Sequence, residues 1–424
     1  MIAPLQAQPS STSADTDKIF PARVATTILP ANVITMGLSV SSEYDDNFLS
    51  DNVNKQSNLM TIIEPHFAWN WSRGRLGWLV DTRNGFSASA QSSADRSRSH
   101  AVDATLRFRQ NKRLTITLTN SFLESTNPFD FFRAADSSPG NGAGIPQRPT
   151  DFIPGSTAHT RSERAAASVS YALSAHGQMG LSGSFFNVKH SVAASSQLPA
   201  EFVGDEASFG VRGFYAHQLA RHQGMDLAYK LEKLSGRNGT SLIHSVLYTQ
   251  TISLSSTSKL SVFTGPEVAL MRNGFAAPDP TLNAVPARLF TWHWAGGATY
   301  NWKAGKNQLA LSLSRTIGNG SGLLGAVRLT SVTAGWSRKI ARGWTADLSS
   351  SHDRDVTLDD AKTKLSFLWV SGGLTHALSQ DLSVALKYWR VHQGASNSAL
   401  GSSLADHNRA AVTLVYEHRE AMGR

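Results

Sequence analysis

Residues 114–124 read Leu-Thr-Ile-Thr-Leu-Thr-Asn-Ser-Phe-Leu-Glu, and this stretch decides the fold class. Apolar side chains stand at Leu114, Ile116, Leu118 and Phe122, and the positions between them carry Thr or Ser. Successive side chains of a β-strand point to opposite faces of a sheet, so this alternation predicts a strand with one apolar and one polar face.

The same alternation recurs along the chain from residue 33 to residue 419, with turn residues between the segments. A second clear case is Met225, Leu227, Tyr229 and Leu231 alternating with more polar residues. We expect strands near 33–45, 58–71, 75–86, 99–109, 113–124, 160–174, 178–190, 205–219, 223–234, 240–252, 259–271, 288–302, 307–317, 326–340, 344–354, 364–378, 382–393 and 407–418.

The connections between these segments alternate, with few exceptions, between tight turns such as Ser72-Arg73-Gly74 and loops of up to about 35 residues. Alternation alone would also suit a soluble β-sandwich, which buries one face of each sheet. Short turns on one rim and long loops on the other favour an all-β fold instead, a transmembrane antiparallel up-and-down barrel of about eighteen strands, with sixteen as the alternative. An even strand number places both termini on the short-turn, periplasmic side.

Composition agrees with a barrel and restricts the other classes. Hydrophobic residues make up 41% of the chain and charged residues 17%. No run of 18 apolar residues occurs, so helices are not expected to span a membrane. The net charge of +9 comes from dispersed Arg and Lys without basic runs, which does not favour nucleic acid as a partner.

Three regions follow from the pattern. Residues 1–31 have no basic segment followed by an apolar core, so we expect the signal peptide to be absent and this stretch to be a flexible periplasmic tail. Residues 32–419 form the barrel, and residues 420–424 form a C-terminal tail.

Aromatic residues fall on the apolar phase, most of them close to tight turns, which predicts a girdle at the inner membrane interface. The alternative is the aromatic core of a soluble β-protein. The residues are Trp69, Trp71, Trp78, Phe108, Tyr171, Tyr300, Trp302, Trp336 and Trp344.

The opposite phase is expected to line the lumen and carries charge. Eight bases against five acids would make the lumen mildly positive and give a preference for anions. The alternative is that these side chains pair across strands and hold the wall rigid. The expected pore-lining bases are Arg107, Arg109, Arg113, Arg164, Arg212, Lys230, Lys387 and Arg409, and the acids are Asp103, Asp226, Glu232, Glu267 and Asp347.

The segment from Ser125 to Thr157 is the candidate for a loop that folds into the pore as a constriction, with packing over the rim as the alternative. Its candidate constriction residues are Asn127, Phe129, Asp130, Phe131 and Arg133.

No catalytic residues, metal ligands or cofactor are expected. Ser349, Ser350, Ser351, His352 and Asp353 lie together in the sequence, but adjacent strand residues point to opposite faces and so do not form a triad by proximity.

Short phrases of the chain resemble those of β-barrel porin families, particularly uncharacterised acidobacterial members. They are Tyr44-Asp45-Asp46-Asn47 with Phe48, the segment Phe263–Glu267, and Gly320-Ser321-Gly322 followed by Gly325-Ala326-Val327-Arg328. This resemblance implies an outer-membrane location and a porin-like role without naming a solute. One departure is the last strand, where Tyr416 is followed by Glu417-His418-Arg419 and not by a terminal aromatic residue.

We therefore expect a channel for passive diffusion of small hydrophilic or anionic solutes. The alternatives are a polysaccharide export barrel with periplasmic partners and a plugged structural or adhesive barrel. Expected partners are the lipid bilayer, lipopolysaccharide and the barrel-assembly machinery, with a homo-trimer plausible for a porin of this size.

Overall fold

The computed structural model describes residues 32–48, 55–90, 96–126, 158–192, 205–236, 239–273, 288–319, 326–358, 363–396 and 403–422. These residues form eighteen β-strands, and among them there is no helix long and apolar enough to cross a membrane. The strands are β1 (Val33–Asp45), β2 (Asn58–Arg73), β3 (Leu76–Ser89), β4 (Arg96–Arg109), β5 (Leu114–Ser125), β6 (Ala158–Ala172), β7 (Gly177–Val192), β8 (Glu206–Ala220), β9 (Gln223–Gly236), β10 (Gly239–Ser253), β11 (Ser258–Asn273), β12 (Arg288–Ala304), β13 (Asn307–Asn319), β14 (Ala326–Ala341), β15 (Trp344–Thr357), β16 (Lys364–Ala377), β17 (Leu382–Ala395) and β18 (Ser403–Ala421).

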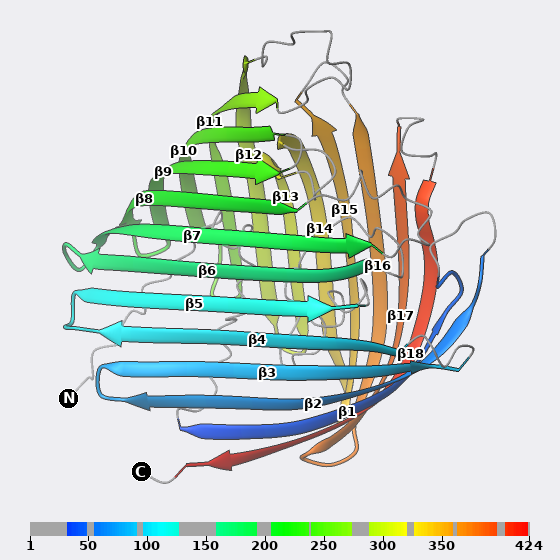
Figure 1. The fold of residues 1–424 in the computed structure, drawn as a ribbon. Helices are drawn as coiled ribbons and strands as arrows, with labels where there is room; N and C mark the ends of the chain where they lie inside the picture. Colours follow the sequence, from blue (N-terminus) through cyan, green and yellow to red (C-terminus); the bar gives the residue numbers. More distant parts are fainter. Residues whose placement is uncertain are drawn as a thin grey trace, which may run out of the picture.

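Every strand pairs antiparallel with its neighbours in the sequence, and β1 also pairs with β18, which closes the sheet into a barrel (Figure 1). In the closing pair, Val33 lies opposite Ala421 and Asp45 lies opposite Arg409. The expected all-β antiparallel barrel of eighteen strands is confirmed. Closure satisfies backbone groups that an open sheet edge would leave unpaired, a condition for crossing the bilayer interior.

The strand bounds agree closely with the sequence expectations. The first strand spans Val33–Asp45 as expected, and the largest extension is in β18, which runs from Ser403 to Ala421 instead of 407–418. The segment after Tyr416 therefore continues the strand, although it lacks a terminal aromatic residue. The expected tail of residues 1–31 lies outside the described residues.

The short connections, apart from the two-residue connection between β9 and β10, lie at one rim, which we call the short-turn rim. Both ends of the described chain lie at this rim (Figure 1). Side-chain oxygens shape several of these turns: Asn111 Oδ1 accepts from the backbone N–H groups of Arg113 and Leu114, and Ser379 Oγ accepts from those of Asp381 and Leu382. Gly305 adopts a φ of 55°, a left-handed conformation that favours glycine. The other rim carries the longer connections and is called the long-loop rim.

Exposure alternates along several strands, clearly in β1 and β10, and separates an outer from an inner face. Along β1, Met36, Leu38 and Val40 are exposed, whereas Thr35, Ser41 and Glu43 between them are buried. The register carries this division around the barrel, so the outer face is apolar and the inner face is largely polar. A water-soluble sandwich would bury the apolar face and expose the polar one.

Aromatic rings on the inner face lie against glycines of neighbouring strands. A Cβ atom built on Gly180 would collide with the Phe214 ring, and one on Gly297 would collide with the Phe263 ring. Glycine is therefore needed at these two positions so that the rings can lie flat along the wall.

Candidate functional site: the inner face of the barrel

An ion-pair network joins β1 to β18 on the inner face, near the long-loop rim. Arg409 contacts Glu43 and places Nε 3.3 Å from Asp45 Oδ2, while His407 Nδ1 lies 3.1 Å from Asp45 Oδ1. Asn47 donates its backbone N–H to Asp45 Oδ1. Glu43, Asp45, His407 and Arg409 are all buried, so Arg409 is held by carboxylates across the strand pair that closes the barrel.

A second group of paired charges lies halfway up the wall, on β8 and β9. Arg212 Nη2 lies 2.7 Å from Asp226 Oδ1, and Lys230 Nζ lies 2.9 Å from Glu232 Oε2. The side chains of Arg212 and Asp226 are 9% and 12% exposed, so water reaches this pair poorly. These four predicted pore-lining residues share the inner face and form two ion pairs.

Arg164 and Arg212 also lie over aromatic rings of the inner face. The Arg164 Cζ atom is 4.8 Å from the centroid of the Phe186 ring, and the Arg212 Cζ atom is 5.1 Å from that of Phe214. Such cation–π contacts hold the guanidinium flat against the wall.

Arg107 and Arg109 differ from these paired bases. Both are exposed on the inner-face phase of β4, opposite Thr117 and Thr115 of β5. Among the described residues, no carboxylate lies within ion-pair distance of either guanidinium. Asp103 lies on the same face of β4, nearer the middle of the strand. These two arginines are therefore free to attract an anion near the short-turn rim.

The remaining predicted charges take different positions. Lys387 of β17 and Asp347 of β15 both lie opposite Gly373 of β16, on the inner-face phase. Arg113 lies in the β4–β5 turn, exposed at the short-turn rim and not on the wall, because its backbone N–H is used by the Asn111 turn.

The register also brings acids to the inner face that the sequence reasoning left out. They are Glu43, Asp45, Glu64, Asp81, Glu206, Asp353 and Asp355. Bases that the sequence expectation left out share this face as well, among them Arg83, Lys259 and Lys303. The mildly positive lumen therefore stays a prediction. Its effective charge depends on which side chains are paired, as Asp81 is with His66 and Arg83.

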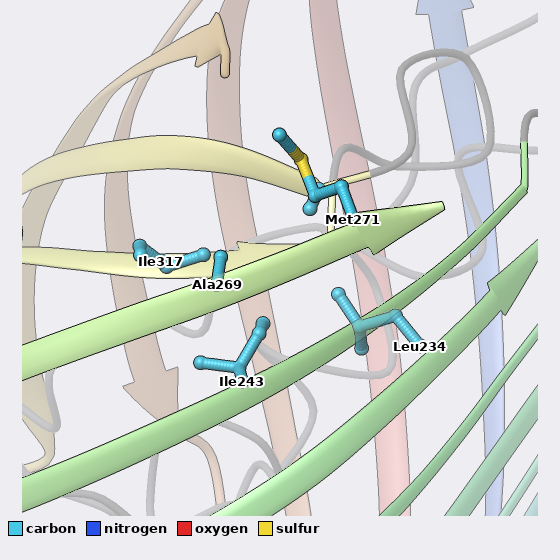
Figure 2. Close-up of a cluster of buried hydrophobic side chains, with 6 residues drawn as sticks. Leu234, Ile243, Ala269, Met271 and Ile317 are labelled. Carbon is cyan, nitrogen blue, oxygen red and sulfur yellow. The ribbon is translucent and has the colours of Figure 1, made fainter. Parts of the chain in front are cut away.

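Glu267 of β11 holds the end of β13 inside the barrel. Its Oε2 accepts from the backbone N–H of Ile317 at 2.7 Å, and its Oε1 accepts from Ser245 Oγ at 3.1 Å. Ile317 then packs into a buried apolar cluster, shown in Figure 2, with inner-face residues of β9, β10 and β11. The cluster consists of Leu234, Ile243, Ala269, Met271, Ile317 and Ala326.

The ends of β13 and β14 thus lie against the inner side of the wall formed by β9–β11. Val327 of β14 is fully buried beside Ala326, so both faces of this hairpin end are covered. We call residues 316–319 and 326–328 the inner hairpin. It occupies part of the lumen on the long-loop side. The constriction expected from Asn127, Phe129, Asp130, Phe131 and Arg133 lies outside the described residues.

The sequence contains a signal for the inner hairpin that alternation alone did not reveal. The apolar phase of β13, β14 and β15 is interrupted by Arg315, Arg328 and Arg354, which lie close together in the sheet. Arginine facing lipid at mid-depth costs about 2–4 kcal/mol, so three interruptions indicate that this part of the sheet departs from the regular lipid-facing pattern.

The aromatic residues expected to form a girdle lie on the outer-face phase near the short-turn rim. The rings of Trp69 and Trp78 lie 4.7 Å apart, and those of Trp71 and Trp78 lie 5.3 Å apart. Trp344 stacks on His376 of the neighbouring strand, with 4.2 Å between ring centroids. Tyr171, Tyr300, Trp302 and Trp336 share the outer-face phase of their strands. Their role as an interfacial girdle stays a prediction.

The serine and histidine group near the end of β15 is divided between the two faces. Ser351 Oγ donates to Asp353 Oδ2 at 2.7 Å on the inner face, whereas His352 is exposed on the outer-face phase. Imidazole and hydroxyl therefore do not meet, as the sequence reasoning expected of adjacent strand residues.

A closed antiparallel barrel with an apolar outer face and a charged inner face defines a β-barrel protein of the outer-membrane type. No protein-family model matches the chain, and no curated protein matches it by sequence.

Among solved structures, the chain has a distant likeness to several proteins of Pseudomonas aeruginosa. OccK2 (OpdF) of Pseudomonas aeruginosa in complex with glucuronate is 12% identical with a TM-score of 0.46, over 91% of this chain and 98% of that one. OpdK of the same organism with vanillate is 10% identical with a TM-score of 0.44, over 91% and 99%. The ferric enterobactin receptor PfeA mutant R480A/Q482A of this organism is 9% identical with a TM-score of 0.43, over 92% and 81%.

Proposed function

We propose that the protein is a channel of the bacterial outer membrane through which small hydrophilic solutes diffuse passively, with a preference for anions. The observation that carries this proposal is the pair Arg107 and Arg109, exposed on the inner face with no carboxylate of the described residues within ion-pair distance. Several other inner-face bases are held by acids, as Arg212 and Arg409 are. In this assignment the short-turn rim and both termini face the periplasm.

Physical reasoning supports an aqueous lumen. A barrel of eighteen strands is wider than side chains can fill, so water or inserted segments occupy its interior. Unpaired cations in a water-filled passage with low-dielectric walls concentrate anions and repel cations. The paired charges on β8 and β9 hold the wall and contribute little net field.

The test is ion selectivity of the purified protein in planar bilayers under a KCl gradient. We expect the wild-type reversal potential to indicate preference for chloride. In the double variant Arg107→Gln/Arg109→Gln, the anion-to-cation permeability ratio is expected to fall by about twofold or more, because two unpaired positive charges are lost from the same strand.

The matched control is Arg73→Gln/Arg338→Gln, which removes the same charge from the outer-face phase of the same rim. This control should keep the wild-type ratio. Cation preference in the wild-type protein would contradict the anion assignment. Complete absence of conductance would favour a plugged barrel, and transport only with a periplasmic partner would favour polysaccharide export.

A further inference from the structure

The barrel wall is interrupted between β12 and β13 on the long-loop side. Described backbone pairing between these strands ends at Gly296 and Arg315, although β12 continues to Arg288 and β13 continues to Asn319. We call this interruption, between residues 289–295 and 316–319, the β12–β13 seam. The other edge of β12 stays paired with β11 along its length.

The seam exists because β13 turns inward. Continuing the register would place Ile317 beside Trp294, whereas Ile317 is 3% exposed in the inner apolar cluster. On the edge of β13 that no longer pairs with β12, the Ile317 N–H donates to the Glu267 carboxylate instead. The separation is therefore built by bonded and packed residues and is not an unsupported fraying of two strand ends.

Exposed aromatic side chains line the outer side of the seam. Phe290, Trp292 and Trp294 of β12 are 64%, 56% and 55% exposed. Trp294 is fixed by its Nε1, which donates to Thr264 Oγ1 at 2.6 Å. Trp302 marks the short-turn side of the same strand. Ten tilted residues of strand cover about 25 Å, so Trp292 lies at the opposite edge of the apolar band.

Two exposed arginines lie beside the seam on the outer-face phase of β13 and β15. Arg315 and Arg354 both lie opposite Thr330 of β14. Arg328 pairs with the inward-turned Ile317 and belongs to the inner hairpin, so it is not part of this group. Arg315 pairs with Gly296 at the last position where β12 and β13 are joined, which places it at the seam. Within the described part of the chain, no carboxylate lies in ion-pair distance of these two guanidinium groups.

We propose that the β12–β13 seam binds an anionic amphiphile from the outer leaflet, with Arg315 and Arg354 holding its phosphate or carboxylate group and Phe290, Trp292 and Trp294 contacting its acyl chain. The proposal rests on the outer-membrane placement proposed above, but not on the passage of hydrophilic solutes through the lumen.

The chemistry of the seam selects this kind of ligand. Guanidinium groups bind phosphate and carboxylate through paired hydrogen bonds, and like charges held together on one face gain most from a bound anion. Exposed aromatic rings at the edge of the apolar band suit a chain that lies in the bilayer.

The test is equilibrium binding of radiolabelled dodecyl phosphate to the purified full chain in maltoside micelles. We expect saturable binding that the double variant Arg315→Gln/Arg354→Gln weakens by tenfold or more, a change of about 1.4 kcal/mol. A dodecyl phosphate with a nitroxide on its chain should quench tryptophan fluorescence, and Trp292→Leu/Trp294→Leu should remove a measurable part of this quenching.

The matched control is Arg272→Gln, an exposed arginine on the outer-face phase of β11 near the same rim, which should bind as the wild type does. Inorganic phosphate at equal concentration should not displace the amphiphile, and dodecanol should bind at least tenfold more weakly.

Unchanged binding in Arg315→Gln/Arg354→Gln, with folding verified by the mobility of the unheated protein on gels, would overturn the proposal. Displacement by inorganic phosphate would assign an aqueous anion site and overturn the acyl-chain part, and tight binding of dodecanol would overturn the anionic part. We propose that chloride selectivity depends on Arg107 and Arg109, so Arg315→Gln/Arg354→Gln should keep the wild-type selectivity. Failure of the binding proposal can therefore be distinguished from failure of the channel proposal.

Discussion

Replacing Arg409 by methionine is expected to lower the free energy of unfolding by about 3–5 kcal/mol, because the change leaves Glu43 and Asp45 buried without their cation. His407 compensates Asp45 only in part, since its imidazole contacts one oxygen of that carboxylate. The measurement is the denaturant midpoint of the barrel in lipid vesicles, followed by tryptophan fluorescence.

The position of the network explains why its loss should affect the whole barrel. Glu43 and Asp45 belong to β1 and Arg409 to β18, and these two strands close the sheet. Charge repulsion between the orphaned carboxylates therefore acts at the pair whose separation would open the barrel. β1 pairs with β2 on one edge and with β18 on the other, so a disturbance of the β1–β18 pair is transmitted to the rest of the sheet.

The control is Arg390→Met, on the outer-face phase of β17 near the same rim. Arg390 pairs with Asp406 at 3.3 Å, but its side chain is 49% exposed, so this exposed pair contributes about 0–1 kcal/mol. The triple variant Glu43→Gln/Asp45→Asn/Arg409→Met should recover most of the lost stability, because no isolated charge remains. An Arg409→Met protein with the wild-type midpoint would contradict this account.

The sequence predicts the wall of this barrel well because each strand carries its own signal. Thr115, Thr117 and Thr119 alternate with apolar residues inside a single strand, and the faces they indicate are those of the structure. Turn chemistry is equally local, as the hydrogen bonds of Asn111 to the following N–H groups illustrate.

The inner face was harder to predict because its contacts join residues far apart in the chain. Nothing near Arg409 indicates that Glu43 is its partner, since closure of the barrel alone brings β18 to β1. Counting bases and acids on one phase therefore could not show which charges are paired. Arg212 and Asp226 lie on consecutive strands, so their pairing could be predicted from the register of one hairpin. The pairing of Arg409 with Glu43 could not.

The inner hairpin was missed for a related reason. Ile317 continues the apolar alternation of β13, so by pattern it belongs on the outer face beside Trp294. Its contact with Ile243 and its backbone hydrogen bond to Glu267 arise only after the hairpin bends into the lumen. Arg315, two residues earlier on the same phase, was the available signal.

Replacing Ile243 by aspartate is expected to release the inner hairpin and raise single-channel conductance by about twofold, since the current through a water-filled pore follows its open cross-section. Ile243 is 1% exposed and lies within the cluster that holds Ile317. A carboxylate there would face apolar side chains and the nearby Glu232 of β9, opposite which it lies.

The direction of the change follows from comparing magnitudes. Keeping an uncompensated carboxylate buried costs several kcal/mol. The Glu267 carboxylate holds the inner hairpin by accepting one hydrogen bond from the backbone N–H of Ile317. As a bond to a charged group, it contributes about 1.5–3 kcal/mol. Displacing the hairpin and hydrating the new charge is therefore the less costly response. The wall of β9–β11 keeps its backbone pairing, so the barrel itself should stay folded.

Two controls distinguish release of the hairpin from a general effect of charge or packing. Ile243→Val removes one methylene group at a cost of about 0.5–1.5 kcal/mol and should leave conductance unchanged. Ile62→Asp introduces the same charge at a position of β2 that is 3% exposed on the inner face but outside the cluster, and it should not raise conductance. A folded Ile243→Asp protein with wild-type conductance would show that the inner hairpin does not limit the current.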